Sequence, residues 1–263
     1  MNFNFLKDKY LKKLFSLFEK YGEKLYVVGG AIRDTLIGQN ISDIDLVTTM
    51  PPKKMLEMFE ENNIRCNSPG INYGTVHCFF NKDIFEITTL REDTYKKKTI
   101  KGKTVFSRYP DVKFIKDINL DAKRRDFTIN ALYLTQKGEI IDPLNGMEDL
   151  KNGIVKFIGN PLNSVAYDPL RILRYFRFCA SGFYKNFDEV SLAVCIANFD
   201  KIFNLNKRKF ADEYNKMMKC RGRFVIFNKW NEFGILEKIE TYANTINEEI
   251  RIEDAKRKEK ERK

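Results

Sequence analysis

Residues 25–49 read LYVVGGAIRDTLIGQNISDIDLVTT, and this stretch decides the fold of the first part of the chain. An apolar, β-rich run leads into Gly29 and Gly30, a helical segment follows, and Asp43 and Asp45 open a second β-rich run. Glycine has no Cβ, so the backbone of this pair can approach a phosphate closely at the N-terminus of a helix, where the helix dipole favours anions. The stretch therefore predicts a strand, a turn suited to a triphosphate, a helix and another strand.

Three carboxylates are candidates for a metal site. Asp43 and Asp45 are two residues apart on a predicted strand, so both would project from one face and could share divalent cations. Glu86 lies in the β-rich run DIFEITTLR, with Phe85 and Ile87 on the opposite face, and could lie beside the aspartates in one sheet. Such hard oxygen ligands suit Mg²⁺, which would activate an attacking hydroxyl and stabilise a leaving pyrophosphate. An isolated Asp-x-Asp pair also occurs in turns and caps, so the spacing alone leaves both roles open.

A second charged motif is RRDFTINA, which begins with Arg124, Arg125 and Asp126. One interpretation is a helix start, with Asp126 as the cap and the arginines in solvent. The other is a nucleotide site, because two guanidinium groups beside a carboxylate suit a phosphate and a ribose hydroxyl.

A third charged motif is DPLRILRYFRF. Asp168, Arg171, Arg174 and Arg177 recur every three residues, so they follow one face of a predicted helix while apolar residues fill another. This pattern fits an exposed face with a weak ion pair. It also fits base recognition, because a carboxylate accepts from an exocyclic amine and an arginine donates to ring acceptors.

The composition narrows the classes of protein. The 263 residues carry 47 Lys and Arg against 36 Asp and Glu, a net charge of +11, which favours a polyanionic partner such as nucleic acid or serves solubility alone. The sequence has no apolar run of the ~18 to 20 residues that a membrane span needs. Five scattered cysteines without a C-x-x-C pair argue against a zinc ribbon or a disulfide framework and indicate a reducing compartment. The single histidine, His77, excludes a His-rich metal site, and we expect it to be a packing residue of an apolar strand.

The pattern of elements changes along the chain. Short β-rich runs alternate with helical segments over residues 25–134, and helical spacing dominates later. A connector with three Gly and two Pro occupies residues 141–161. We therefore expect one domain over 1–140, a helical region over 141–250, and a charged tail over 251–263 that is a frayed helix or disordered.

Six segments in this order and spacing resemble the class II CCA-adding tRNA nucleotidyltransferase and poly(A) polymerase family, a branch of the polymerase-β-like nucleotidyltransferases. They are GGAIRDTLIG, SDIDLVTT, FEITTLR, RRDFTINAL, DPLNGMEDL and DPLRILRYFRF. The resemblance covers about residues 25–178. It implies an α+β N-terminal nucleotidyltransferase head, with a mixed sheet and helices, followed by an all-α neck and partial body.

The resemblance also implies the site residues. Asp43 and Asp45 would be the Mg²⁺ ligands, and Glu86 would be a supporting catalytic carboxylate. The nucleotide would be bound by Gly29, Gly30, Arg33, Arg125, Asp126, Asp168, Arg171, Arg174 and Arg177. Within this set, Gly30 and Arg33 would contact the triphosphate, and Arg125 would bind the nucleotide beside Asp126, which would select ribose through the 2′-hydroxyl.

In the third motif, Asp168 and Arg171 would form a protein template that pairs with CTP and ATP, while Arg174 and Arg177 would make further nucleotide or phosphate contacts. The template motif departs from the family at Tyr167, where a Glu is usual, so the support of the template is in question. Asp142 and Asp149 would belong to a hinge motif.

One further departure concerns RNA binding, and one further segment concerns the choice of nucleotide. Family members usually continue through a body and tail that grip tRNA, so we expect a short form whose positive charge holds tRNA weakly and with strong salt dependence. Residues 91–110 are lysine-rich and lie where the family has a flexible loop needed for the switch to ATP. This segment is either that loop or a disordered, solvated insertion.

The sequence thus predicts an Mg²⁺-dependent enzyme that adds CCA to tRNA 3′ ends from CTP and ATP without a nucleic-acid template. The alternatives are a partial enzyme that adds only CC or only A, a poly(A) polymerase, and a non-catalytic RNA-binding protein with the same fold. We expect no membrane association and no obligate protein partner. A cytoplasmic location is expected, with an organelle as the alternative.

Overall fold

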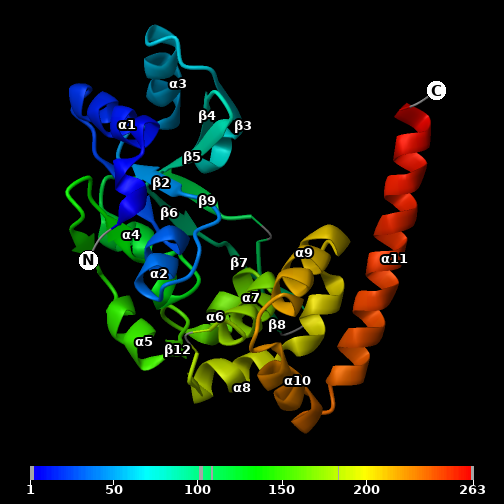
Figure 1. The fold of residues 1–263 in the computed structure, drawn as a ribbon. Helices are drawn as coiled ribbons and strands as arrows, with labels where there is room; N and C mark the ends of the chain where they lie inside the picture. Colours follow the sequence, from blue (N-terminus) through cyan, green and yellow to red (C-terminus); the bar gives the residue numbers. More distant parts are fainter. Residues whose placement is uncertain (1–2, 101–102, 108, 183, 262–263) are drawn as a thin grey trace. The chain divides into compact units, whose positions relative to one another are not determined.

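The computed structural model describes residues 3–100, 103–107, 109–182 and 184–261. Contacts divide the chain into two compact units, Met1–Lys151 and Asn152–Lys263, and each is described by itself. The first unit is built on a seven-stranded sheet (Figure 1). In spatial order its strands are β11 (Ile140–Ile141), β10 (Tyr133–Leu134), β1 (Leu25–Val28), β2 (Asp45–Thr48), β5 (Asp83–Thr89), β4 (Thr75–Phe80) and β3 (Cys66–Gly70).

The sheet is mixed, as the resemblance implied. Strands β2 and β5 pair in parallel, and the other neighbouring strands of the sheet pair antiparallel. The register sets Asp45 opposite Glu86, and Glu86 opposite His77 on the other side. Because directly opposed residues project from the same face of a sheet, these three side chains form one row across β2, β5 and β4.

The helices of the first unit are α1 (Lys9–Lys20), α2 (Gly30–Leu36), α3 (Pro52–Glu61), α4 (Ile118–Lys123) and α5 (Gly146–Asn152). Of these, α1 and α2 pack against β1 of the sheet, and α3 packs against β3 and β4. Helix α1 is strongly amphipathic, and its Leu11, Leu14 and Phe18 are buried in the core of this unit. Burying such side chains stabilises a fold by roughly 1.5–3 kcal/mol each, so the core keeps the strands that carry the charged row fixed.

Residues 141–151 belong to the first unit by contacts, although the sequence predicted the domain boundary at residue 140. Thr128 donates a hydrogen bond to Asp149 at 2.6 Å, and Asp142 accepts from the backbone N–H groups of Gly146 and Met147. A Cβ at Gly146 would meet the carbonyl oxygen of Thr128 at 2.2 Å, so only glycine allows this approach. The expected hinge residues Asp142 and Asp149 therefore tie α5 to the first unit.

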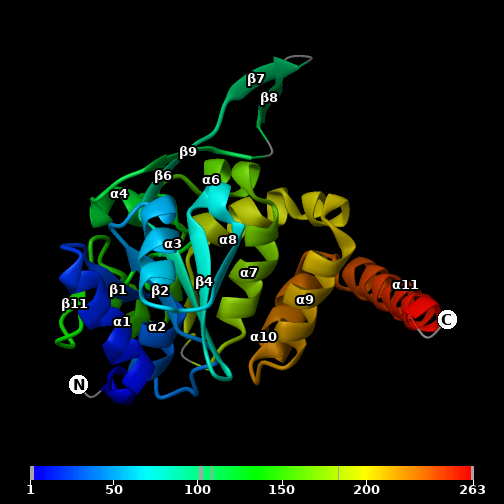
Figure 2. The ribbon, with the colours of Figure 1, turned by 90° about the horizontal axis from the view of Figure 1, so that it is seen from above.

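The lysine-rich segment, expected as a flexible loop or a disordered insertion, forms strands where it is described. Strand β6 (Arg91–Thr94) pairs with β9 (Asp111–Phe114), and β7 (Lys97–Ile100) pairs with β8 (Lys103–Phe106) (Figure 2). Both pairs are antiparallel. Residues 101–102 and 108 lie outside the described residues.

The second unit is helical, as predicted, apart from a short parallel pair of strands, β12 (Ile154–Val155) and β13 (Asn186–Phe187). Its helices are α6 (Pro161–Tyr167), α7 (Leu170–Cys179), α8 (Glu189–Ala197), α9 (Lys207–Met218), α10 (Arg223–Glu232) and α11 (Leu236–Glu261). Phe176 and Trp230 are fully buried and pack edge to face, with ring centroids 5.3 Å apart. Among the helices of the described residues, none has the length and apolar character of a membrane span.

The charged tail differs from the expectation of a frayed or disordered end. Helix α11 continues through Glu261, and residues 262–263 lie outside the described part of the chain. Ion pairs join it to α9: Lys207 contacts Glu249 at 2.8 Å, and Arg208 contacts Asp254 at 2.8 Å. Local sequence composition could not reveal these partners, because they lie more than 40 residues away along the chain.

Candidate functional site

A polar cavity of about 240 Å³ lies within the first unit. Two carboxylates and three guanidinium groups share its wall with hydroxyl and apolar side chains. The lining residues are Val28, Asp45, Leu46, Val47, Thr75, Glu86, Thr88, Arg91, Arg124 and Arg125. A space of this kind suits a ligand that carries both anionic groups and bound cations.

The carboxylates come from the parallel pair of strands. Asp45 begins β2 and is opposite Glu86 on β5, as the sequence predicted for one sheet. Both side chains are solvent-accessible, and the Glu86 side chain is 54% exposed, so both carboxylates are open to a cation from solvent. The two carboxylates on one face could provide oxygen ligands to a divalent cation.

Asp43 is placed differently from the prediction. Strand β2 begins at Asp45, so Asp43 lies in the preceding coil and the alternation of a strand does not determine its direction. It is exposed and accepts a hydrogen bond from the Ser42 hydroxyl. Within the described residues, no group of three or more His, Cys, Asp or Glu side chains is arranged to hold a metal ion.

His77 differs from the expected packing residue. Its Nε2 lies 3.2 Å from Oε2 of Glu86, and its side chain is partly exposed. The alternation of apolar residues along β4 was enough to place His77 off the buried face. Its neighbour Glu86 could not be predicted in this way, because that contact depends on how β4 pairs with β5.

The glycine pair enters α2 with a backbone conformation that favours glycine. Gly29 has a φ of +72°, which L side chains rarely adopt, and a Cβ there would meet the carbonyl oxygen of Asn130 at 3.4 Å. Its N–H donates to the carbonyl of Leu132 at 2.9 Å, so this group is already used within the fold. Gly30, the other glycine predicted to bind a phosphate, is the first residue of α2.

Asn130, which the sequence analysis missed, links Arg33 to Asp126 by hydrogen bonds. Nη1 of Arg33 donates to Oδ1 of Asn130 at 2.5 Å, and Nδ2 of Asn130 donates to Oδ1 of Asp126 at 3.0 Å. All three side chains are buried or nearly so, although Arg33 and Asn130 are 97 residues apart. The second residue of the predicted RRD motif, Arg125, lines the cavity instead.

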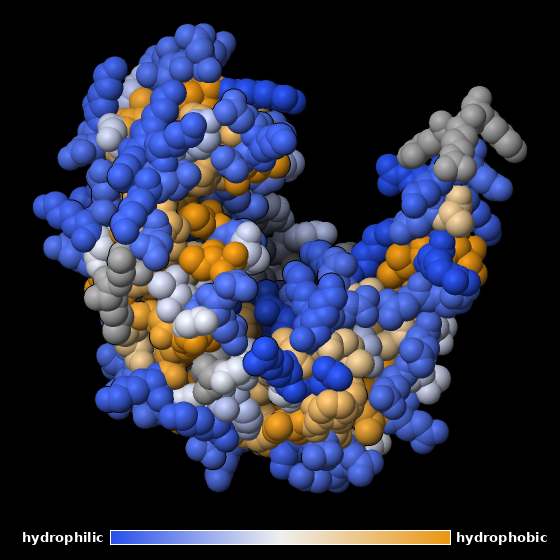
Figure 3. Space-filling model, viewed as in Figure 1, coloured by the Kyte–Doolittle hydropathy of each residue, from blue (hydrophilic) through white to orange (hydrophobic). Residues whose placement is uncertain are grey.

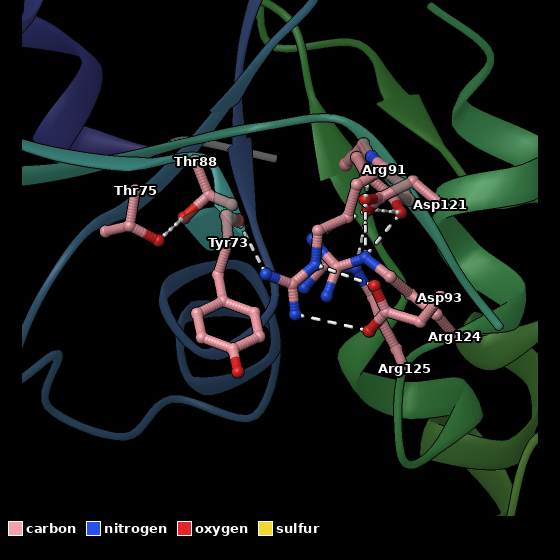
Figure 4. Close-up of polar contacts among 9 residues, drawn as sticks. Tyr73, Thr75, Thr88, Arg91, Asp93, Asp121, Arg124 and Arg125 are labelled. Carbon is pink, nitrogen blue, oxygen red and sulfur yellow. Dashed lines mark hydrogen bonds and ion pairs between the residues drawn. The ribbon is translucent and has the colours of Figure 1, made fainter. Parts of the chain in front are cut away.

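The three arginines of the cavity wall, Arg91, Arg124 and Arg125, are called the arginine cluster. Figure 4 shows them gathered around Asp121 and Asp93. Arg91 pairs with Asp93 at 3.0 Å, while Asp121 of α4 pairs with both other arginines. Sequence analysis missed Asp121, and its spacing of three and four residues before Arg124 and Arg125 on a helix was the available signal.

Asp121 is fully buried, yet it is charged. Burial would raise the pKa of its carboxyl group, but the charges of Arg125 and Arg124, the Arg91 N–H and the Tyr133 hydroxyl outweigh burial and lower the pKa to about 2. Burial in the same cluster raises the pKa of the Tyr133 hydroxyl. For Arg125, the charge of Asp121 outweighs burial and raises the guanidinium pKa.

Stability should therefore depend on pH through Asp121. Because its folded-state pKa lies below the ordinary 3.8, the stabilisation is present above about pH 4 and is lost as the pH falls towards 2. The shift corresponds to about 2 kcal/mol at 1.36 kcal/mol per pKa unit. In urea titrations between pH 2 and 6, the excess unfolding free energy of the wild type over Asp121→Asn should shrink by this amount as the pH falls. A difference that is constant with pH would contradict the charged, paired state.

The predicted template residues belong to the second unit. The carboxylate of Asp168 accepts from the Leu170 N–H at 3.1 Å at the start of α7, and Arg171 donates to the Ser164 hydroxyl at 2.6 Å. The carbonyl of Asp168 accepts from the Arg171 N–H at 3.1 Å, so the two residues share one turn.

Arg174 and Arg177 do not form the simple exposed stripe that one interpretation of the sequence offered. Both converge on the buried carboxylate of Glu213 on α9, with N–O distances of 3.5 and 2.6 Å. Sequence analysis missed Glu213, because a contact between two helices is not encoded in the spacing along either one.

Comparisons with known proteins agree with this architecture. Residues 25–156 match the protein family described as the poly A polymerase head domain. Human mitochondrial CCA tRNA nucleotidyltransferase 1 is 44% identical over 169 residues, which are 64% of this chain and 37% of that protein. The CCA-adding enzyme of Lactobacillus helveticus strain DPC 4571 is 32% identical over 214 residues, which are 81% of this chain and 51% of that protein.

A crystal structure of the Bacillus stearothermophilus CCA-adding enzyme in complex with CTP is similar in fold. Its TM-score is 0.73 at 23% identity, and the match covers 88% of this chain and 56% of that chain. Among the curated relatives named above, the chain spans between 37% and 51% of their length.

Proposed function

The chain belongs to the poly A polymerase head domain family, and on this premise we propose that it adds CCA to tRNA 3′ ends, with CTP and ATP as substrates and pyrophosphate as the product. One observation carries the proposal: Asp45 and Glu86 share a cavity with the arginine cluster. Carboxylates can hold a divalent cation and guanidinium groups can bind the phosphates of a nucleotide, so one cavity holds both parts of a nucleotidyl transfer site. We infer the RNA substrate, tRNA, from the names of the relatives.

Nucleotidyltransferases of this family use a divalent metal, and we propose that the metal of this chain is Mg²⁺. Asp43 and Asp45 would hold the ion, with Glu86 in support, and phosphate and water oxygens would complete the shell, as is usual for Mg²⁺. When bound, the ion activates the RNA 3′-hydroxyl and stabilises negative charge on the phosphates.

The protein side chains then position the reactants. The arginine cluster would bind the triphosphate and stabilise the charge that develops on pyrophosphate as the bond from the 3′-oxygen to the α-phosphorus forms. Asp126, held by Asn130, would accept from the ribose 2′-hydroxyl, and Arg33 and Gly30 would contact the phosphates. Asp168 and Arg171 would read the base, and Arg174 and Arg177, oriented by Glu213, would add nucleotide or phosphate contacts.

The test is a direct assay of 3′-end addition. The purified chain with Mg²⁺ is incubated with tRNAs that end before CCA, after C and after CC, with each nucleotide supplied singly and together, and the 3′ ends are sequenced. We expect ends at CCA, with C added from CTP and then A from ATP.

Other products of this assay would replace the proposal. Ends at CC, or A added to the CC substrate alone, identify a partial enzyme, and long A tails identify a poly(A) polymerase, the activity for which the matched family is named. Bound tRNA with no addition identifies a non-catalytic RNA-binding protein. Hydrophilic residues cover much of the visible face of the first unit (Figure 3). The net charge of +11 supports a polyanionic partner. A cytoplasmic location, with an organelle as the alternative, stays a prediction.

A further inference from the structure

The arginine cluster presents an electrostatic problem that the cavity alone does not solve. Arg124 and Arg125 are adjacent in the sequence and both line the cavity, together with Arg91. Burial and the charges of the other two arginines act to lower the guanidinium pKa of Arg124, while the charge of Asp121 opposes this. Without a buried anion, the neighbouring cations would repel one another and turn towards solvent.

Asp121 supplies that anion from behind the cavity wall. The backbone N–H of Arg91 and the Nε of Arg124 donate to Oδ1 of Asp121 at 3.1 and 2.8 Å. Nε and Nη2 of Arg125 donate to Oδ2 at 3.1 and 2.9 Å, and the Tyr133 hydroxyl donates to the same oxygen at 2.8 Å. The residue is fully buried and does not line the cavity, so it acts on a ligand only through the arginines.

Tyr133 completes the support of Arg125. Its hydroxyl accepts from Nε of Arg125 at 3.0 Å while donating to Asp121, and the guanidinium carbon lies 5.2 Å from the centroid of its ring. These contacts use one edge and one face of the planar guanidinium group, and Nη1 takes no part in them. The orientation of Arg125 is therefore fixed before any ligand binds, which lowers the entropy cost of binding.

We propose that Asp121 is a positioning residue that sets Arg124 and Arg125 in place for the phosphate chain of the incoming nucleotide. This inference rests on the proposed function, because it takes a nucleoside triphosphate as the ligand of the cavity. All nucleoside triphosphates share the phosphate chain, so Asp121 controls affinity for every nucleotide equally and has no part in the choice of base.

The sign of the effect separates positioning from simple electrostatics. Asp121 is negative, so its removal makes the surroundings of the cavity more positive. Net charge alone then predicts that Asp121→Asn binds a polyanion more tightly. If Asp121 acts by orienting the arginines, the same substitution weakens binding, because asparagine cannot accept as strongly from both guanidinium groups.

The experiment measures binding directly, by calorimetry, with tripolyphosphate, CTP and ATP as the probes. For Asp121→Asn we expect the dissociation constants of all three to rise by the same factor, about tenfold or more. Tyr133→Phe keeps the charge of Asp121 and should raise the three constants by a smaller common factor. Glu23→Gln is the matched control, because Glu23 is a largely buried carboxylate of the same unit, paired with Lys116 at 2.9 Å, that does not line the cavity. Its binding should equal that of the wild type.

Circular dichroism and thermal unfolding establish that each variant is folded, and Tyr133→Phe carries the test if Asp121→Asn is not. Folded variants that bind all three probes like the wild type, or more tightly, overturn the inference, as do factors that differ between CTP and ATP. A purely structural role would destabilise the fold without a common rise in the three constants. Tripolyphosphate binding needs no tRNA, so if the wild type binds it without adding nucleotides to RNA, the proposed function fails and this inference is still tested.

Discussion

Asp45→Asn is expected to reduce nucleotide incorporation into RNA by about a thousandfold. Asp45 lines the cavity, lies opposite Glu86, and is proposed to hold the divalent ion. Asparagine has nearly the same shape but no charge, so the ion would be bound weakly and misplaced. A loss of this size corresponds to about 4 kcal/mol of transition-state stabilisation, within the range for a charged group that acts on the reacting phosphate.

The assay compares initial rates of CMP incorporation at saturating Mg²⁺ and tRNA. Asp83→Asn is the matched control, because Asp83 is an exposed aspartate on β5 that does not line the cavity. The control should keep the wild-type rate. Since the Asp45 side chain is exposed, thermal unfolding of Asp45→Asn should match that of the wild type. Full activity of this variant would show that the assignment of the metal to Asp45 is wrong.

Asp168→Ala is expected to relax the choice of nucleotide. In the proposed template, the carboxylate accepts from the exocyclic amine of cytosine or adenine, which uracil and guanine do not present in the same place. Each well-placed polar contact of this kind discriminates by ≈ 1–3 kcal/mol. Preference for CTP and ATP over UTP and GTP should therefore fall by roughly ten- to a hundredfold, measured as the ratio of kcat/KM values.

A control is needed because Asp168 also accepts from the Leu170 N–H at the start of α7. Asp188→Ala removes a comparable bond in the same unit, where Asp188 caps α8 by accepting from the Ser191 N–H at 2.9 Å. If loss of a cap were the cause, both variants would lose selectivity. Unchanged selectivity in Asp168→Ala would remove the template role from this residue.

These two variants, together with Asp121→Asn, separate three tasks of the proposed reaction. Asp45 is expected to affect the chemical step, Asp168 the choice of base, and Asp121 the affinity for every nucleotide. Substitution at each residue thus changes a different kinetic quantity, so a change in the fold as a whole cannot imitate all three results.

The sequence predicted most secondary structure because the signals are local. Alternation of apolar residues placed Glu86 on the outer face of its strand, and β5 does alternate in burial. Helical spacing predicted helices over residues 168–180, 189–198 and 208–219, which correspond to α7, α8 and α9. The lysine-rich segment was harder, since a two-stranded ladder depends on pairing with a partner rather than on composition.

The site divides in the same way. By itself, the sequence determined which residues bear the reactive groups and on which elements they lie, because motif spacing and side-chain periodicity are properties of a short stretch of chain. Only the tertiary structure decided which side chains are in contact. The parallel register of β2 and β5 sets Asp45 beside Glu86, Asn130 lies between Arg33 and Asp126, and Glu213 pairs with two arginines. Apart from Asn130 and Asp126, these partners lie tens of residues apart along the chain. The packing of buried surfaces brings them together, and for the arginines on buried Glu213 the low dielectric of that interior strengthens the charge pairs that orient the side chains.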